Sequence, residues 1–203
     1  MEVEVLEQRQ RLFGEDNPDT IRAAANLAAT YWQQGRWREA EKMEVEVLEQ
    51  RQRLFGKDNP DTISAAANLA TTYQQQGKWR EAEKMQVEVL EQSQRLFGKD
   101  NPDTIKAAAD LAFTYSNQGQ LDDAEKIQVD VLEQRQRLLG SDHPATIKST
   151  AHLGWTYYMQ NQLQDAEKLV TNAVEMNTNL AGNEHPDTIL YSGYLSTIHK
   201  ARY

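Results

Sequence analysis

The chain copies itself at a fixed period, and this period limits the folds that are open to it. Prolines occur at positions 18, 60, 102, 144 and 186, and glycines recur at 14, 56, 98, 140 and 182, so both series advance by 42. The first two copies, residues 1–42 and 43–84, differ only at positions 15, 22, 29, 32 and 36 of the first copy. Such self-similarity indicates a stack of structural units, in which each unit buries its apolar face against its neighbours.

The first half of each copy predicts an amphipathic helix. Asn17 is a suitable cap, Pro18 fits the first helical position, and Asp19 meets the positive end of the helix dipole. Apolar residues follow at intervals of three and four, which places them on one face; they are Ile21, Ala24, Leu27, Ala28 and Tyr31. Gly35 predicts the end of this helix, with a left-handed backbone.

The second half of each copy predicts another helix, from about Trp37 to Gly56. Its expected inward-facing residues are Trp37, Ala40, Met43, Val47, Leu48, Leu54 and Phe55. The loops are about two to five residues long, so neighbouring helices are expected to pack antiparallel. Glu39 and Glu41 recur in corresponding positions and are expected on a solvated face.

The whole pattern predicts an all-α protein of about ten helices in one array over 1–203. Residues 1–14 repeat 43–56 and are expected to form the second helix of a truncated unit. The expected helix pairs span 18–56, 60–98, 102–140 and 144–182, and 186–203 forms a terminal first helix. We favour a fragment of a longer array over a natural short one. Apolar faces left open at the ends would invite end-to-end self-association.

The composition excludes several classes of partner. The net charge is −9, which disfavours nucleic acid and anionic membrane surfaces. No apolar run reaches the roughly 20 residues of a membrane span, and MEVEVLEQRQ lacks the features of a signal peptide. The chain has no cysteine, which excludes disulfides and favours an intracellular, cytoplasmic setting.

The repeated unit resembles the tetratricopeptide repeat, whose spacing is matched by Leu27, Ala28, Tyr31, Gly35 and Ala40. The longer period and the opening NPDT or HPDT are similar to the kinesin-light-chain subtype, and near-identical copies look like the sensor arrays of fungal NOD-like receptors. The resemblance implies a right-handed α-solenoid whose first helices line a concave groove for a peptide or protein segment. It also implies a ligand-sensing or cargo-binding role within a larger protein.

The copies disagree mainly along one face of the first helix, which we call the variable stripe. Positions 22, 26, 29 and 33 of the first copy are spaced by four, three and four, so they share a helix face. The neighbouring column of Trp32 is counted with the variable stripe. The candidate binding residues from these columns are Arg22, Asn26, Trp32, Gln33, Asn68, Gln74, Lys106, Asp110, Phe113, Asn117, Lys148, His152, Trp155, Tyr158 and Tyr194. Aromatic residues supply much of the binding energy at protein interfaces.

Three roles are expected within this set. The apolar anchors are Trp32, Phe113, Trp155, Tyr158 and Tyr194. The resemblance assigns contact with the ligand backbone to Asn26 and Asn68, and Asn117 is expected to act likewise. Arg22, Lys106 and Lys148 make the stripe locally cationic, which favours an acidic or amphipathic peptide.

Other interpretations stay open at this point. The stripe could be a solvated face under relaxed selection, and the module could serve self-assembly through its open ends. The chain has no phosphate-binding or nucleophile motif, so we expect no enzyme activity and no cofactor. His143 and His185 occupy the capping column before proline, and no histidine pair has ligand spacing, so we expect no metal site.

Overall fold

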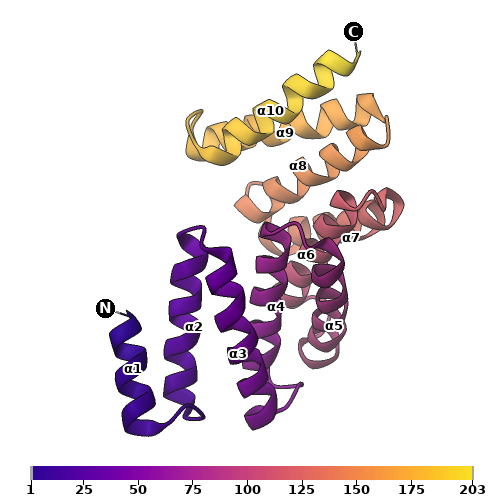
Figure 1. Ribbon diagram of the computed structural model, residues 1–203. Coiled ribbons are helices and arrows are strands. Elements are labelled where there is room, and N and C mark those ends of the chain that lie inside the picture. The colour runs from indigo at the N-terminus through magenta and orange to yellow at the C-terminus, as the bar shows by residue number, and fades with distance from the viewer. Residues whose placement is uncertain (1, 203) are drawn as a thin grey trace. The chain divides into compact units, whose positions relative to one another are not determined.

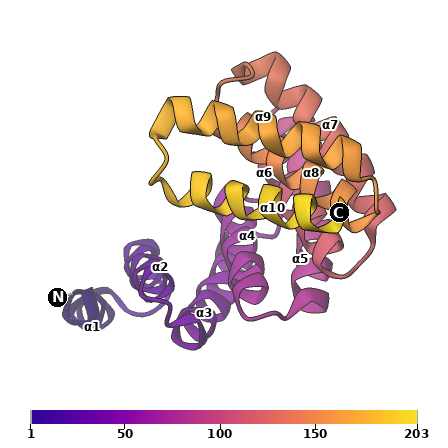
Figure 2. The same ribbon diagram turned by 90° about the horizontal axis from the view of Figure 1, so that it is seen from above.

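The computed structural model describes residues 2–202; Met1 and Tyr203, which end two of the expected ranges, lie outside them. Within the described residues the chain forms ten α-helices and no strand. It divides into two compact units, residues 1–99 and 100–203. Each unit is a stack of helices in which consecutive helices pack side by side (Figures 1 and 2). The expectation of a single continuous array over 1–203 stays a prediction.

The helix bounds follow the repeat. Unit 1 contains α1 (Glu2–Phe13), α2 (Pro18–Gln33), α3 (Trp37–Phe55), α4 (Pro60–Gln75) and α5 (Trp79–Phe97). Unit 2 contains α6 (Pro102–Asn117), α7 (Leu121–Leu139), α8 (Pro144–Met159), α9 (Leu163–Ala181) and α10 (Pro186–Arg202). The even-numbered helices are thus the expected first helices, and the odd-numbered ones are the second helices.

Side-chain caps start the first helices as predicted. The Asn17 side-chain oxygen accepts a hydrogen bond from the Asp19 amide at 2.9 Å, and Pro18 occupies the first turn. In α8 and α10 a histidine takes the same role: His143 Nδ1 accepts from the amide two residues later at 3.1 Å, and His185 Nδ1 does so at 3.2 Å. The capping interpretation of these two histidines is confirmed.

A residue with positive φ separates the two helices of each pair. Gly35 has φ +70°, a conformation that glycine adopts without steric cost. Asn161 fills the same column after α8 with φ +64°, and it is the sole non-glycine residue with positive φ among residues 2–202. Asn tolerates this region better than most side chains, so the turn survives the substitution.

The buried columns agree with the predicted apolar stripe in most places. Ile21, Leu27 and Ala28 in α2 are buried, as are Ala40 and Val47 in α3. In unit 1, Ile21 and Val47 belong to one apolar cluster that also receives residues of α4.

The prediction was wrong for the last turn of the second helix and for its first residue. Leu54 and Phe55 are each 41% exposed, and Trp37 is exposed as well. The second helix has 19 residues and the first has 16, so the second extends about one turn further. Leu54 and Phe55 lie in this extension, beyond the helices that would cover them.

Polar side chains connect successive copies inside each unit. Glu41 accepts hydrogen bonds from Lys78 Nζ at 2.7 Å and from Gln76 Nε2 at 2.8 Å. In unit 2, Glu125 accepts from Gln160 Nε2 at 2.8 Å. The glutamate column expected on a solvated face therefore helps to hold one helix pair on the next.

Candidate functional site

In unit 1 most residues of the variable stripe are polar and exposed. Arg22, Asn26, Gln33 and Asn68 are exposed, and so is Trp32, which is the stripe's aromatic residue in α2. Arg22 forms an exposed ion pair with Asp19 at 2.5 Å, which contributes little to stability.

A small recess lies beside this surface. It has a volume of about 120 Å³ and is lined by residues of α1 and α2: Glu2, Val5, Arg9, Arg22, Ala23 and Asn26. Arg22 and Asn26, two of the predicted site residues, therefore lie together at its wall. The recess is too small for more than one short side chain of a ligand.

One predicted residue of unit 1 is not on the surface. Gln74 is only 7% exposed, although its column in α2 carries the exposed Trp32. The corresponding Ser116 in α6 is buried too, with its hydroxyl 3.2 Å from Thr156 Oγ1 of α8. Gln74 is therefore unavailable for direct contact with a ligand in this conformation.

Unit 2 carries an aromatic patch, which consists of Phe113 in α6, His152, Trp155 and Tyr158 in α8, and Tyr194 in α10. The Trp155 ring stacks on the Tyr194 ring with centroids 4.4 Å apart, and its centroid is 4.9 Å from that of Tyr158. The rings of Phe113 and His152 lie 5.4 Å apart. All five side chains are partly exposed. Rings in such contact stabilise one another.

The electrostatics of the patch keep His152 uncharged. Burial lowers the pKa of its imidazole to about 4, and the nearby charges of Lys148 and Arg135 lower it further. His152 is therefore neutral at physiological pH, and the patch presents an uncharged aromatic surface with cationic side chains beside it.

Arg135 is a contributor that sequence reasoning missed. It comes from the second helix α7, and its Nη1 donates to the carbonyl oxygen of Ala145 at 3.0 Å and to the hydroxyl of Ser149 at 2.7 Å. Arg9 and Arg51 make the same bond to the carbonyl ten residues later, at 2.9 and 2.7 Å. The recurrence of arginine in this column was the available signal. Burial lowers the pKa of Arg135, which nevertheless remains charged.

The other predicted residues of unit 2 are partly engaged within the protein. Lys106 Nζ and Asp110 Oδ2 pair at 2.9 Å, which reduces the free positive charge. Asn117 donates from Nδ2 to the carbonyl oxygen of Phe113 at 2.8 Å, so its amide group is partly used by its own helix. Lys148 is exposed, and no ion pair to it occurs among residues 2–202.

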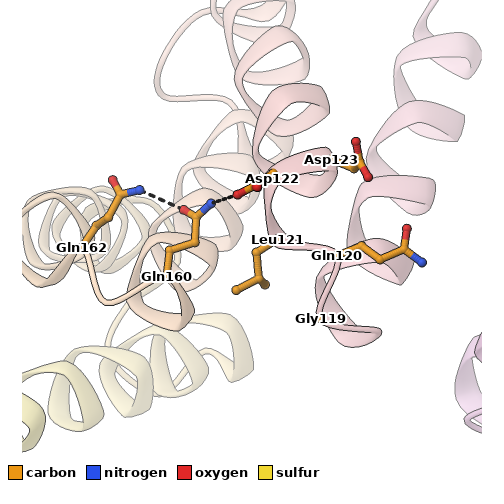
Figure 3. A pocket seen from close by; sticks show the side chains of 7 residues that line it. All are labelled: Gly119, Gln120, Leu121, Asp122, Asp123, Gln160 and Gln162. Carbon is orange, nitrogen blue, oxygen red and sulfur yellow. Dashed lines mark hydrogen bonds between the residues drawn. The ribbon is translucent and has the colours of Figure 1, made fainter.

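A larger open recess of about 550 Å³ lies at the α6–α7 and α8–α9 turns (Figure 3). Leu121 lines it where the first two copies have the larger Trp37 and Trp79. The Gln160 amide donates to Asp122 Oδ1 at 3.3 Å and accepts from Gln162 Nε2 at 3.1 Å (Figure 3). These side chains satisfy one another, and we see no nucleophile paired with a base here.

Two further properties bear on function. Within residues 2–202, no group of three or more His, Asp or Glu side chains is placed to hold a metal ion. None of the helices described is both long and apolar enough to span a bilayer.

Comparison with known proteins places these features in a family. Two family models, both described as tetratricopeptide repeat, match the chain: one at residues 45–94, 61–128 and 104–179, the other at residues 20–61. No curated protein matches it significantly.

Solved structures match over nearly the whole chain. A protein of Podosopora anserina described as a kinesin light chain with nearly identical tetratricopeptide-like repeats has 24% sequence identity and a TM-score of 0.76. That match covers 92% of this chain and 88% of the other. BtubC (BKLC) of P. vanneervenii has 23% identity and a TM-score of 0.79, covering 99% and 81%. The predicted tetratricopeptide repeat and the all-α solenoid class are confirmed, and the fold is like that of the kinesin-light-chain-like structure.

Proposed function

Because the chain belongs to the tetratricopeptide repeat family, a fold that typically serves as a protein-interaction scaffold, we propose that it binds a peptide or protein segment without catalysing a reaction. The binding surface is the variable stripe of the first helices. We place this scaffold in the cytoplasm, as the ligand-sensing or cargo-binding part of a larger protein.

The observation that carries the proposal is the aromatic patch of unit 2. Near-identical copies preserve the residues that pack the fold, whereas the patch replaces Ala29 and Asn26 of the first copy with Trp155 and His152. The rings pack on one another and are partly exposed, so a part of each ring is open to a ligand. The rings come from the three first helices α6, α8 and α10, and they are in contact both within α8 and between neighbouring first helices. Such a cluster favours selection for binding over neutral drift.

The charges beside the patch suggest the chemistry of the ligand. Lys148 is exposed, and Arg135 lies close enough to lower the pKa of His152. An amphipathic peptide would place an apolar side chain against Trp155 and an acidic one near Lys148. In unit 1, Asn26 and Asn68 would bond the peptide backbone, since amide side chains can both donate and accept.

The test is selection from a random peptide display library on the intact chain. Phe113→Ala and Trp155→Ala should each weaken the selected peptides at least about tenfold, because each removes an apolar anchor. Trp37→Ala is the matched control: Trp37 is exposed but lies outside the variable stripe. Circular dichroism of each variant checks that the fold is retained. Equal binding by the Trp155→Ala and Trp37→Ala variants would refute the proposal.

Charge preference has a separate test. Lys148→Glu should reduce the affinity of peptides rich in Asp and Glu and leave uncharged peptides nearly unaffected, because the reversed charge repels carboxylates. The measurement is a titration at two ionic strengths. Identical losses for acidic and neutral peptides would show that Lys148 has no role in charge selection.

A further inference from the structure

The turn that joins the two helices of a pair differs in charge between the two units. In unit 1 the residue after the turn glycine is a cation, Arg36 or Lys78, and a tryptophan and an arginine follow it. In unit 2 the same column carries Gln120 and Gln162, the tryptophan is a leucine, and Asp122 takes the place of the arginine after α6. Three adjacent columns thus change together, whereas the alanine, glutamate and lysine that come shortly after them are kept in all four copies.

In unit 1 the cation of the α4–α5 turn is bound by the preceding second helix. Lys78 Nζ donates to both carboxylate oxygens of Glu41 at 2.7 Å, and Gln76 Nε2 donates to the same carboxylate at 2.8 Å. The ammonium group also lies 5.4 Å from the centre of the Tyr73 ring. Glu41 therefore accepts one amide and one cation beside an aromatic ring, and all of these groups come from the chain itself.

Unit 2 retains the amide part of this contact and has lost the cation. Glu125, the equivalent of Glu41, accepts from Gln160 Nε2 at 2.8 Å, which repeats the amide bond of unit 1. Gln162 takes the position of Lys78, and its Nε2 donates to Gln160 at 3.1 Å. Among residues 2–202, no cationic side chain forms an ion pair with the Glu125 carboxylate.

The electrostatics of the tyrosine at this turn differ accordingly. Burial raises the pKa of Tyr157, and the charges of Glu125 and Asp165 raise it further. Burial also raises the pKa of Tyr73 in unit 1, but there the charge of Lys78 opposes the shift. The turn in unit 2 thus combines a half-buried aromatic ring with negative charge that no cation of the chain balances.

A second carboxylate converges on the same place. Gln160 Nε2 donates to Asp122 Oδ1 at 3.3 Å as well as to Glu125, so these two carboxylates lie close together around one amide group. The open recess of about 550 Å³ at this turn is lined by Leu121, Asp122, the exposed Asp123 and both glutamines of the α8–α9 turn (Figure 3). Its volume is in the range of sites that hold small organic groups.

We propose that this recess binds an arginine or lysine side chain of a partner protein, in place of the cation that unit 1 supplies from its own chain. The charged group bonds to the carboxylates of Asp122 and Glu125, and the aliphatic stem lies against Leu121. The contact is weak when it acts alone, because the recess is open and Asp122 is exposed. The site shares no residue with the variable stripe, so the proposal does not depend on peptide binding there.

The test is a titration followed by nuclear magnetic resonance on the intact chain. The probe is a capped glycine hexapeptide that contains two arginines, and its counterpart has citrulline in place of each arginine. The amide signals of Asp122, Asp123 and Gln160 should shift in a saturable manner with the arginine peptide. The citrulline peptide, which has the same shape and no charge, should bind at least about fivefold more weakly.

Two variants reintroduce the residues of unit 1. Gln162→Lys should weaken binding at least about fivefold, because the new ammonium group pairs with Glu125 as Lys78 does with Glu41. Leu121→Trp leaves the charge unchanged and fills the recess, and it should weaken binding at least about threefold. Circular dichroism checks that both variants keep the fold.

Gln136→Lys is the matched control, because it adds the same charge on an exposed residue near the other end of α7. It should change the affinity by less than about twofold. Equal losses in Gln162→Lys and Gln136→Lys would show that the peptide follows the net charge of the chain, and would overturn the proposal. Equal binding of the arginine and citrulline peptides would overturn it too, as would shifts that leave Asp122 and Asp123 unaffected.

Discussion

At the scale of single residues, Glu44 stands out as a buried carboxyl group. It is 8% exposed in α3, and the following copies have the uncharged Gln86 and Gln128 in its column. Burial raises the pKa of Glu44, and the neighbouring charge of Glu41 raises it further, whereas the nearby hydroxyl group of Thr72 opposes the shift. The ionised form is thus disfavoured in the folded protein.

Glu44→Gln should therefore stabilise the protein at neutral pH by about 1–2 kcal/mol. A raised pKa gives a contribution to stability that is fully present below the reference value of 4.5 and is lost as the pH rises through the folded value. The gain from glutamine should accordingly disappear at acid pH. The measurement is the free energy of unfolding in urea at several pH values from about 4 to about 7, below and above that reference pKa. Glu46→Gln on the exposed side of α3 is the control, and an equal gain there would contradict the explanation.

The stability contribution of His152 should depend on pH in the opposite direction to that of Glu44. Its pKa is lowered from 6.5 to about 4 by burial and by Lys148 and Arg135. The stability that goes with the neutral imidazole is present above 6.5 and is lost as the pH falls toward 4. His152→Asn, which introduces the residue of the first two copies, should remove on the order of 2 kcal/mol of this dependence. Thermal unfolding at several pH values measures it, and an unchanged pH profile would contradict the assignment.

At the scale of elements, α8 and α9 pack so closely at Gly154 that no side chain fits there. Gly154 replaces the alanine of Ala28, Ala70 and Ala112, and Val170 replaces Glu44 or glutamine. A Cβ atom added at Gly154 would lie 2.7 Å from Val170 Cγ2 and 3.1 Å from Leu169 Cβ. The two substitutions depend on each other, because the branched side chain of Val170 occupies the space that the methyl group of an alanine at position 154 would fill.

Gly154→Ala should therefore destabilise the protein by about 1–3 kcal/mol, despite the better helix propensity of alanine. Adding Val170→Gln, the residue of two other copies, should recover part of this loss in a double-mutant cycle. Gly193→Ala in α10 is the control: nothing lies within 4 Å of the added methyl group, and we expect a gain of about 0.5–1 kcal/mol. Additive effects of the two α8–α9 changes would show that the contact does not couple them.

At the scale of the whole molecule, the two compact units differ in the side chains of their variable stripes. Unit 1 contains the nearly identical copies and a polar stripe, and unit 2 contains the divergent copies and the aromatic patch. Repeat proteins are stabilised mainly by contacts between neighbouring units, so a part of the stack can fold without the rest. Unit 2 includes three first helices and the two second helices between them.

A fragment of residues 100–203 should thus fold by itself and bind selected peptides within about tenfold of the affinity of the intact chain. The fragment of residues 1–99, made in the same way, serves as the comparison and should bind at least about tenfold more weakly than the fragment of residues 100–203. Circular dichroism and a binding titration measure both properties. A folded 100–203 fragment without measurable binding would show that the aromatic patch is not the main anchor.

The repeated pattern determined the helices, since caps, prolines and glycines act locally. Asn17, Pro18 and Gly35 specify where a helix begins and ends, and the alternation of three and four specifies that Ile21 and Leu27 are buried. The pairing of the helices, their repetition and the family can all be inferred from these local signals. Each of these properties depends on neighbours along the chain.

Tertiary packing decided which members of the variable stripe reach solvent. Trp32 and Gln74 share one column, yet the first is exposed and the second is buried, so equivalent positions of the repeat differ in burial. Leu54 and Phe55 carry an apolar signal and lie in a turn that no helix covers. Arg135 reaches Ser149 from another helix, which no spacing within α8 could reveal. Contacts of this kind join residues that are distant in the chain, so they are determined by the tertiary structure and not by local sequence.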